Sequence, residues 1–198
     1  SFGLNFRAFH DAFWRAMDTD YRELKRRADA VQAALSGATS VEITTSKGTD
    51  LYLEYGGRPV HKDDGVIDEE EARSGYGLAN LPAGEVCLAP LEDRTRGRAV
   101  FDVAYWDGRW MREVVVEFDD SGRGTPVKAA EGLDHFSGVL ASSTGESSRV
   151  GELGIGLNPS VERAVGYVLL DEKLSGSVHL ALGHNTFLGG VNESSLHW

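Results

Sequence analysis

The sequence predicts an α+β protein in which a mostly antiparallel, mixed sheet carries helices on its flank. Two patterns lead to this prediction. Apolar residues recur at helical spacing in the N-terminal segment, whereas most of the remaining chain is short β-rich runs separated by turn-forming pairs such as Asp-Gly and Ser-Gly. At 198 residues, the chain can bury a sizeable core in one large or two small domains.

Two helices are expected at the start of the chain. The first begins behind Asn5, a good N-cap, and carries apolar residues at helical spacing: Phe6, Phe9, Phe13 and Met17. The second ends before Gly37, which suits a left-handed C-cap, and its apolar residues step by three and four: Tyr21, Leu24, Ala28, Val31 and Leu35.

The next segments predict a hairpin, a loop and a meander. Residues 41–44 and 51–55 are β-rich and are joined by a short polar turn. Residues 56–77 have no period, so we expect a loop and a domain boundary there, with solvated carboxylates at Asp63, Asp64 and 68–71. Residues 98–128 read as a β-meander that turns at Asp107-Gly108.

The last third is expected to contain a short helix and two strands. The helix lies within residues 133–142, and the strands cover residues 165–170 and 177–183. The alternation of the second strand directs His179 and Ala181 to one face. We expect a metal site at one end of the sheet, for which the candidate residues follow below.

Composition excludes several classes of function. Twenty basic and 31 acidic residues give a net charge of −11, which argues against binding to nucleic acid or to an anionic membrane and suits cation binding. No apolar run reaches the length of a membrane span, and no signal peptide is recognisable. The single Cys87 allows no internal disulfide, which fits a cytoplasmic location.

Two glutamates have unusual surroundings. Glu85 follows Pro82 and Gly84 directly before an apolar strand, so its carboxylate is held at a loop-to-strand junction. Glu152 is the one charge in a glycine-rich apolar stretch, where a carboxylate is costly unless it is paired or metal-bound. An ion pair with Arg149 or Arg163 is the alternative explanation for Glu152.

Two histidines complete the candidate site. His179 lies on a predicted strand, and His197 follows a glycine-rich loop. A lone buried histidine is more often simply hydrogen-bonded than a metal ligand. Together with Glu85 and Glu152, however, the two imidazoles form a mixed oxygen and nitrogen set that suits zinc, cobalt or manganese.

Four blocks of the sequence resemble those of the thermophilic metallo-aminopeptidases, the aminopeptidase T and aminopeptidase S group. They occur in the family's order: residues 80–86 (NLPAGEV), 150–152 (VGE), 172–183 (EKLSGSVHLALG) and 189–198 (GGVNESSLHW). The resemblance implies a cytoplasmic, homodimeric exopeptidase that acts on peptides with a free N-terminus. It implies two divalent metal ions with Glu85, Glu152, His179 and His197 as ligands. It also implies that residues 1–198 are the C-terminal catalytic portion, with a preceding α/β domain absent.

The resemblance also bears on the residues that would handle protons and substrate. Glu172 is the candidate general base, with an ion pair to a neighbouring Lys or Arg as the alternative. Lys173 would hold either a substrate carbonyl or carboxylate, or a structural carboxylate.

The chain departs from the family at two ligand positions. The family's motif continues with an Asp ligand after the residue matching Trp198, and Thr186 stands where the family has a ligand tyrosine. We therefore expect this chain to bind metal weakly and to be inactive, with its carboxylates turned toward Arg or Lys.

Two alternatives remain. A ring-opening dihydroxypyridine dioxygenase of the same fold would use one non-haem iron at Glu85, His197 and the missing Asp. A non-catalytic relative would only dimerise or bind a peptide. Metal content separates the three: two metal ions, one iron, or none.

Overall fold

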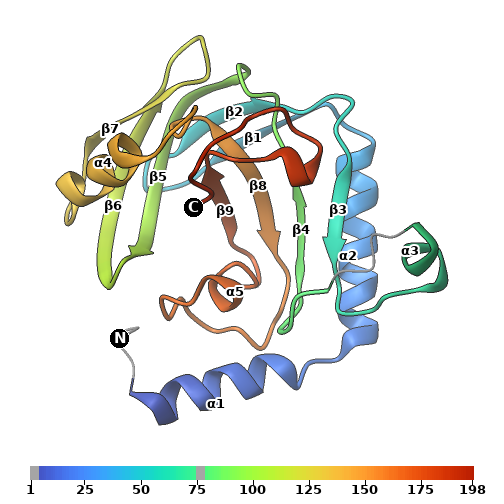
Figure 1. The fold of residues 1–198 in the computed structure, drawn as a ribbon. Helices are drawn as coiled ribbons and strands as arrows, with labels where there is room; N and C mark the ends of the chain where they lie inside the picture. Colours follow the sequence, from blue (N-terminus) through green and yellow to red (C-terminus); the bar gives the residue numbers. More distant parts are fainter. Residues whose placement is uncertain (1–4, 75–78) are drawn as a thin grey trace. The chain divides into compact units, whose positions relative to one another are not determined.

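The computed structural model describes residues 5–74 and 79–198. It confirms the predicted α+β class, and the strands form two antiparallel sheets (Figure 1). By its internal contacts the chain divides into two compact units, which we call the first unit (Ser1–Leu35, Val60–Cys87 and Gly154–His179) and the second unit (Ser36–Pro59, Leu88–Leu153 and Leu180–Trp198). Within the described residues, no helix is long and apolar enough to cross a membrane.

The two N-terminal helices form where the sequence predicts them, but Gly37 is not among the described residues with a left-handed backbone. Helix α1 (Phe6–Met17) begins at Asn5, whose side chain accepts a hydrogen bond of 2.9 Å from the Ala8 amide. Helix α2 (Tyr21–Ser36) begins behind Asp20, whose carboxylate accepts the amides of Arg22 and Glu23. The N-terminal end of each helix is thus fixed by a side chain that accepts from amides without a partner inside the helix.

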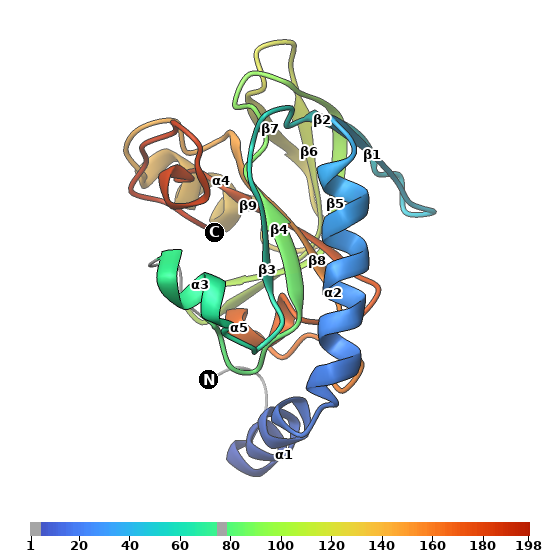
Figure 2. The same ribbon diagram turned by 90° about the vertical axis from the view of Figure 1, so that its right-hand side faces the viewer.

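Each helix packs one face into the core of the first unit. The buried residues of α2 contact Ala83, Val86 and Leu157, so within the first unit this helix packs beside the start of the strand Glu85–Leu88 (Figure 2). Helix α1 packs through Ala16 and the half-buried Phe9 and Ala12 against a second cluster of buried residues: Val161, Val165 and Leu170.

Asn158 joins parts of the first unit that are distant in sequence. Its side chain is fully buried and donates to the carbonyls of Ala16 in α1, at 3.0 Å, and of Ala83, at 2.9 Å. The backbone N–H of Asn158 donates to the Lys173 carbonyl at 2.9 Å. A single amide side chain therefore ties the end of α1 to the turn that precedes Glu85.

The second unit contains a five-stranded sheet in the order β1-β2-β5-β6-β7. The predicted turn at Asp107-Gly108 is confirmed, with φ of 45° and 76°, as a tight hairpin requires. Helix α4 (Leu133–Ser142) packs beside this sheet, with the rings of Phe136 and Phe101 6.0 Å apart. The strands are β1 (Ser40–Thr44), β2 (Asp50–Glu54), β5 (Thr95–Trp106), β6 (Arg109–Phe118) and β7 (Gly124–Lys128).

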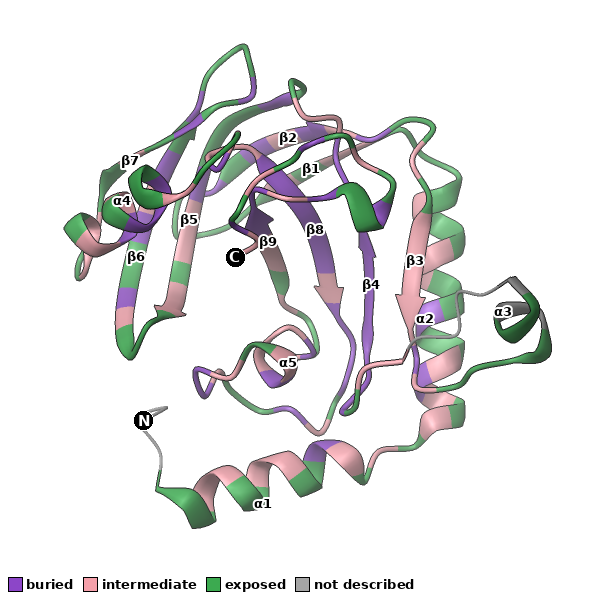
Figure 3. Ribbon diagram, in the orientation of Figure 1, coloured by how far each residue is buried: buried purple, intermediate pink, exposed green. Residues whose placement is uncertain are grey.

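The other sheet has the order β3-β4-β8-β9. Its strands are β3 (Val60–Asp63), β4 (Glu85–Leu88), β8 (Val150–Gly156) and β9 (Val178–Leu182). Strand β4 is buried along its whole length and β8 at all but one position, which is unusual for strands that carry charge (Figure 3). These strands carry Glu85 and Glu152.

Two expectations about secondary structure are wrong. The predicted loop at 56–77 contains β3 and the short helix α3 (Glu69–Ser74); its residues 75–77 lie outside the described residues. Residues 165–170 are not a strand but a turn leading into helix α5 (Val168–Asp171). Gly166 has a φ of 80°, and the Asp171 carboxylate accepts the amides of Val165 and Gly166, so the apolar run is folded back on itself.

Candidate metal centre

The turn before β4 holds Glu85 in a defined position. Gly84 has a φ of 130°, and a Cβ there would come within 2.7 Å of the Asn158 side chain, so only glycine fits. The Gly84 N–H donates to the backbone carbonyl of Asp63 at 2.9 Å, and the Gly84 carbonyl accepts from the Leu157 N–H at 2.8 Å. Glu85 is only 5% exposed.

His179 lies next to Glu85 in the first unit. Its Nε2 is 3.4 Å from Oε2 of Glu85. The imidazole lies directly against Gly154 of β8, because a Cβ built at Gly154 would clash with the ring. The sequence prediction that His179 is carried on a strand is therefore confirmed, and a glycine makes room for it.

Lys173 has no exposed surface and contacts three carboxylates of the first unit. Its Nζ donates to Oε1 of Glu85 and lies 3.5 Å from Asp63 Oδ2 and 3.6 Å from Glu172 Oε2. Burial alone would lower its pKa, but Glu85, Glu172 and Asp63 outweigh that effect and raise it. Of the two kinds of partner considered for Lys173, the structure shows carboxylates of the chain itself.

Asp63 is a member of this group that the sequence analysis missed. Its carboxylate was expected to be solvated, as was that of Asp64; both expectations are wrong, since the Asp63 side chain is 12% exposed and that of Asp64 2%. Burial raises the pKa of Asp63 to about 6, against the opposing effect of Lys173. No local pattern marks Asp63, because its partners lie far away in the sequence.

Glu172 lies at the C-terminal end of α5, with a side chain that is 21% exposed. Its carboxylate is paired with Lys173, which is the ion pair considered as the alternative to a catalytic role. Partial exposure still leaves this carboxylate accessible to solvent.

In the second unit, Glu152 is paired with His197. Glu152 is 6% exposed, and its Oε2 lies 3.0 Å from Nε2 of His197. The other ring nitrogen of His197, Nδ1, is 2.7 Å from the His184 carbonyl and donates to it. Metal-binding histidines usually donate their second ring N–H to such an acceptor, which leaves Nε2 for the metal.

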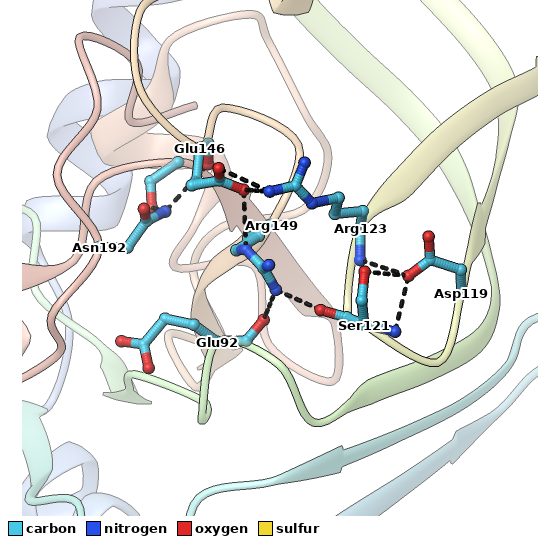
Figure 4. A network of polar contacts seen from close by, with 8 residues as sticks. Glu92, Asp119, Ser121, Arg123, Glu146, Arg149 and Asn192 are labelled. Atoms are coloured by element: carbon cyan, nitrogen blue, oxygen red, sulfur yellow. Dashed lines mark hydrogen bonds and ion pairs between the residues drawn. The ribbon is translucent and has the colours of Figure 1, made fainter.

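Arg149, one of the two cations considered for Glu152, has other partners. It binds the Glu146 carboxylate at 3.0 Å, the carbonyl of Glu92 at 2.7 Å and the carbonyl of Ser121 (Figure 4). Arg123 reaches the same Glu146 carboxylate. The Arg149 guanidinium is thus committed to a structural network.

The segment that leads to His197 is fastened by Glu92. One carboxylate oxygen of Glu92 accepts from Asn185 Nδ2 at 3.0 Å and from the Val191 amide at 2.8 Å, and the other pairs with Arg58 at 2.7 Å. The Asn192 side chain donates to the Glu146 carbonyl at 3.0 Å (Figure 4) and also to the Gly183 carbonyl at 2.6 Å. These contacts fix the backbone that presents the His184 carbonyl to His197.

We expect Glu92→Gln to destabilise the protein and to flatten its response to acid. Burial would raise the pKa of Glu92, but the hydrogen bonds from Val191 and Asn185 and the charge of Arg58 lower it below its ordinary value of 4.5. A lowered carboxyl pKa gives stability that is present above the unfolded-state pKa and is lost as pH falls through the folded one. Loss of these charge-assisted bonds costs about 1.5–3 kcal/mol each.

The measurement is urea unfolding between pH 3 and pH 7. The variant should be less stable than the parent at pH 7, and the two curves should approach each other at the acid end. Glu193→Gln, which changes a glutamate near the same segment, is the control. A constant difference at every pH would contradict the assignment of the charge to Glu92.

Thr186, which the resemblance aligns with a ligand tyrosine, contacts a histidine in this chain. Thr186 Oγ1 lies 2.9 Å from Nε2 of His184, and the neighbouring Phe187 packs its ring edge-on to His197, with centroids 4.8 Å apart. The Trp198 indole donates to the Tyr105 carbonyl at 3.1 Å. These contacts all lie within the second unit, and Phe187 covers one side of the His197 ring.

Two solved structures have a similar fold. AmpT from Thermus thermophilus is 20% identical and superposes with a TM-score of 0.72 over 96% of this chain and 51% of its own. The 2,5-dihydroxypyridine dioxygenase from Pseudomonas putida KT2440 is 18% identical, with a TM-score of 0.70, over 94% of this chain and 55% of its own. This chain therefore spans about half the length of either protein.

A comparison with curated proteins finds no match. The sequence profile of the family described as thermophilic metalloprotease (M29) matches residues 14–198, which is nearly the whole chain and includes all four candidate ligands. This chain belongs to the thermophilic metalloprotease (M29) family.

Proposed function

We propose that residues 1–198 are the catalytic portion of a metal-dependent aminopeptidase, which releases N-terminal amino acids from peptides. The observation that carries the proposal is the setting of His197: Nδ1 is bound to the His184 carbonyl while Nε2 faces Glu152. A histidine held this way is prepared to bind a cation. Family membership supports a metallopeptidase.

The candidate ligands fit divalent metal ions. Glu85 Oε2 is buried, accepts no hydrogen bond and faces His179, so a ligand atom is directed at a ligand atom. Within the second unit, Glu152 is buried and faces Nε2 of His197 in the same way. Each unit thus offers one carboxylate and one imidazole, and from family membership we infer that Glu85, Glu152, His179 and His197 are the ligands of two ions such as zinc, cobalt or manganese.

Bound there, divalent ions would supply a water that is deprotonated at neutral pH and would polarise the scissile carbonyl. The residues of the chain would position the ions and manage the protons. We assign the proton transfer to Glu172, whose carboxylate is partly exposed and lies 3.6 Å from Lys173 Nζ. An acidic site also suits the free α-amine of a peptide substrate.

A cytoplasmic homodimer remains part of the proposal. Phe6 and Trp14 of α1 are 82% and 56% exposed, and they offer an apolar surface to a second copy.

The second candidate is a mononuclear iron dioxygenase, favoured by the similarity of its fold to the Pseudomonas enzyme. Glu85 and His197 would then hold the iron, while Glu152 and His179 would have no metal to bind. The M29 match and the paired setting of Glu152 favour the peptidase.

Metal analysis and peptide cleavage test these proposals together. The 198-residue chain should be compared with a version that carries an aspartate added after Trp198 and with Thr186→Tyr in that version. We expect metal occupancy and turnover to be weak in the first and to increase toward two ions per chain in the others, because a catalytic zinc needs about three protein ligands.

The substrate control is an N-acetylated copy of the same peptide. A chelator should stop cleavage of the free peptide, and added zinc, cobalt or manganese should restore it. Equal cleavage of the acetylated peptide would rule out an aminopeptidase. One tightly held iron per chain would favour the dioxygenase, and no metal in any version would leave a non-catalytic relative.

A further inference from the structure

The segment that carries Lys173 is rigid and tightly packed in the first unit. Its carbonyl accepts from the Asn158 amide, and Leu174 forms a bridge with Asn158. A Cβ at Gly156 of β8 would clash with the carbonyl of Leu174, so the two backbones lie in close contact. The Lys173 side chain therefore starts from a fixed backbone and has no exposed surface.

A buried ammonium group is costly unless its three protons find acceptors. Lys173 has three carboxylates within 4 Å, of Glu85, Asp63 and Glu172. Lys173 has no exposed surface, so water does not compete for its ammonium group. The lysine is thus an internal cation for a cluster of acids.

The contact divides the two oxygens of Glu85 between two tasks. Oε1 accepts a hydrogen bond from Lys173. Oε2 accepts none and faces His179 Nε2 at 3.4 Å. Because the carboxylate cannot rotate without breaking the first contact, only Oε2 is presented toward the histidine.

We propose that Lys173 is a positioning residue that holds Glu85 by Oε1 and thereby makes it a one-oxygen metal ligand through Oε2. The same cation neutralises the acidic cluster when no metal ion is bound. This inference rests on the proposed metal site. Lys173 itself touches neither metal nor substrate.

The spectroscopic test uses Lys173→Met, which keeps the apolar stem of the side chain and removes its charge. Cobalt(II) is loaded into the protein with the aspartate added after Trp198, and its visible absorption reports coordination geometry. In the variant, Glu85 is free to bind through both oxygens, so the coordination number should increase and the absorption should weaken. An unchanged spectrum would overturn the proposal.

Thermal unfolding supplies the second readout. Loss of one partner of a buried ion pair should lower Tm by about 10 °C in the metal-free protein. The decrease should be clearly smaller in the cobalt-loaded protein, since the ion then supplies positive charge. An equal decrease in both forms would mean that Lys173 contributes only to packing.

Lys62→Met is the matched control. Lys62 also lies in the first unit and pairs with two acids, Asp29 at 2.7 Å and Asp64 at 3.2 Å, but not with Glu85. The variant Lys62→Met should lower stability equally with and without metal and should leave the cobalt spectrum unchanged.

If Lys173→Met does not fold without metal, the double variant Lys173→Met/Glu85→Gln decides. Removal of both charges should restore folding if Glu85 is the group that Lys173 neutralises. Failure of the double variant to fold would overturn the proposal. Absence of cobalt binding by the parent protein would instead contradict the metal site itself.

Discussion

In the version that carries an aspartate after Trp198, Glu152→Gln should abolish peptide turnover and leave the fold intact. The amide has the shape of the carboxylate and can still bond to His197, but it lacks the charge that a metal ligand needs. Loss of outer partners alone costs 10–100-fold in metal affinity or activity, so loss of a ligand should cost more than about a hundredfold. The measurement is kcat/KM on an unblocked peptide, with Tm as the check on folding.

Glu146→Gln is the control for this prediction. Glu146 also belongs to the second unit, but it pairs with Arg123 and Arg149, outside the proposed site. It should reduce stability and spare turnover. Full activity in Glu152→Gln would remove Glu152 from the ligand set.

Gly154→Ala should have the second large effect. The added Cβ would clash with the His179 ring, so either the imidazole or strand β8 must shift. Overpacking of this kind costs about 1–3 kcal/mol of stability. A displaced ligand histidine should also weaken metal binding by more than about a hundredfold, by comparison with the effect of outer partners. Calorimetric titration of zinc into the version with the aspartate added after Trp198, together with urea unfolding, measures both effects.

The control is Gly138→Ala in helix α4, where a Cβ meets nothing within 4 Å. Alanine in a helix interior is about 0.5–1 kcal/mol more favourable than glycine, so this variant should be slightly stabilised. Normal zinc binding by Gly154→Ala would show that His179 is not held where the ligand geometry requires it.

Local sequence patterns predicted the elements whose cause is local. The spacing in α1 and α2 and the Asp107-Gly108 turn act over a few residues, and the structure confirms them. The run 165–170 was misread because a short apolar stretch fits a buried strand and a buried turn equally well. There, Gly166 and the Asp171 carboxylate decide the outcome.

The candidate site shows the same difference between local and long-range causes. The glycines beside Glu85 and Glu152 and the two histidines are visible in the sequence, and the family resemblance identifies the four as one ligand set. The partners of these residues are not visible, because Lys173 and Glu85 lie 88 positions apart and Asp63 falls in a segment without a period. Burial of all three together is a property of the folded chain.

The double contact of Asn158 sets a limit on where this chain can be shortened. Helix α1 is the first element of the chain and carries exposed aromatic residues, so it is a natural target for deletion when a smaller version is designed (Figure 1). Its last turn, however, supplies the Ala16 carbonyl to the amide group that also holds Ala83, two residues before Glu85. A version that begins at α2 would leave a buried N–H of Asn158 without its acceptor, and the damage would be felt at the entrance to β4 rather than at the new end of the chain.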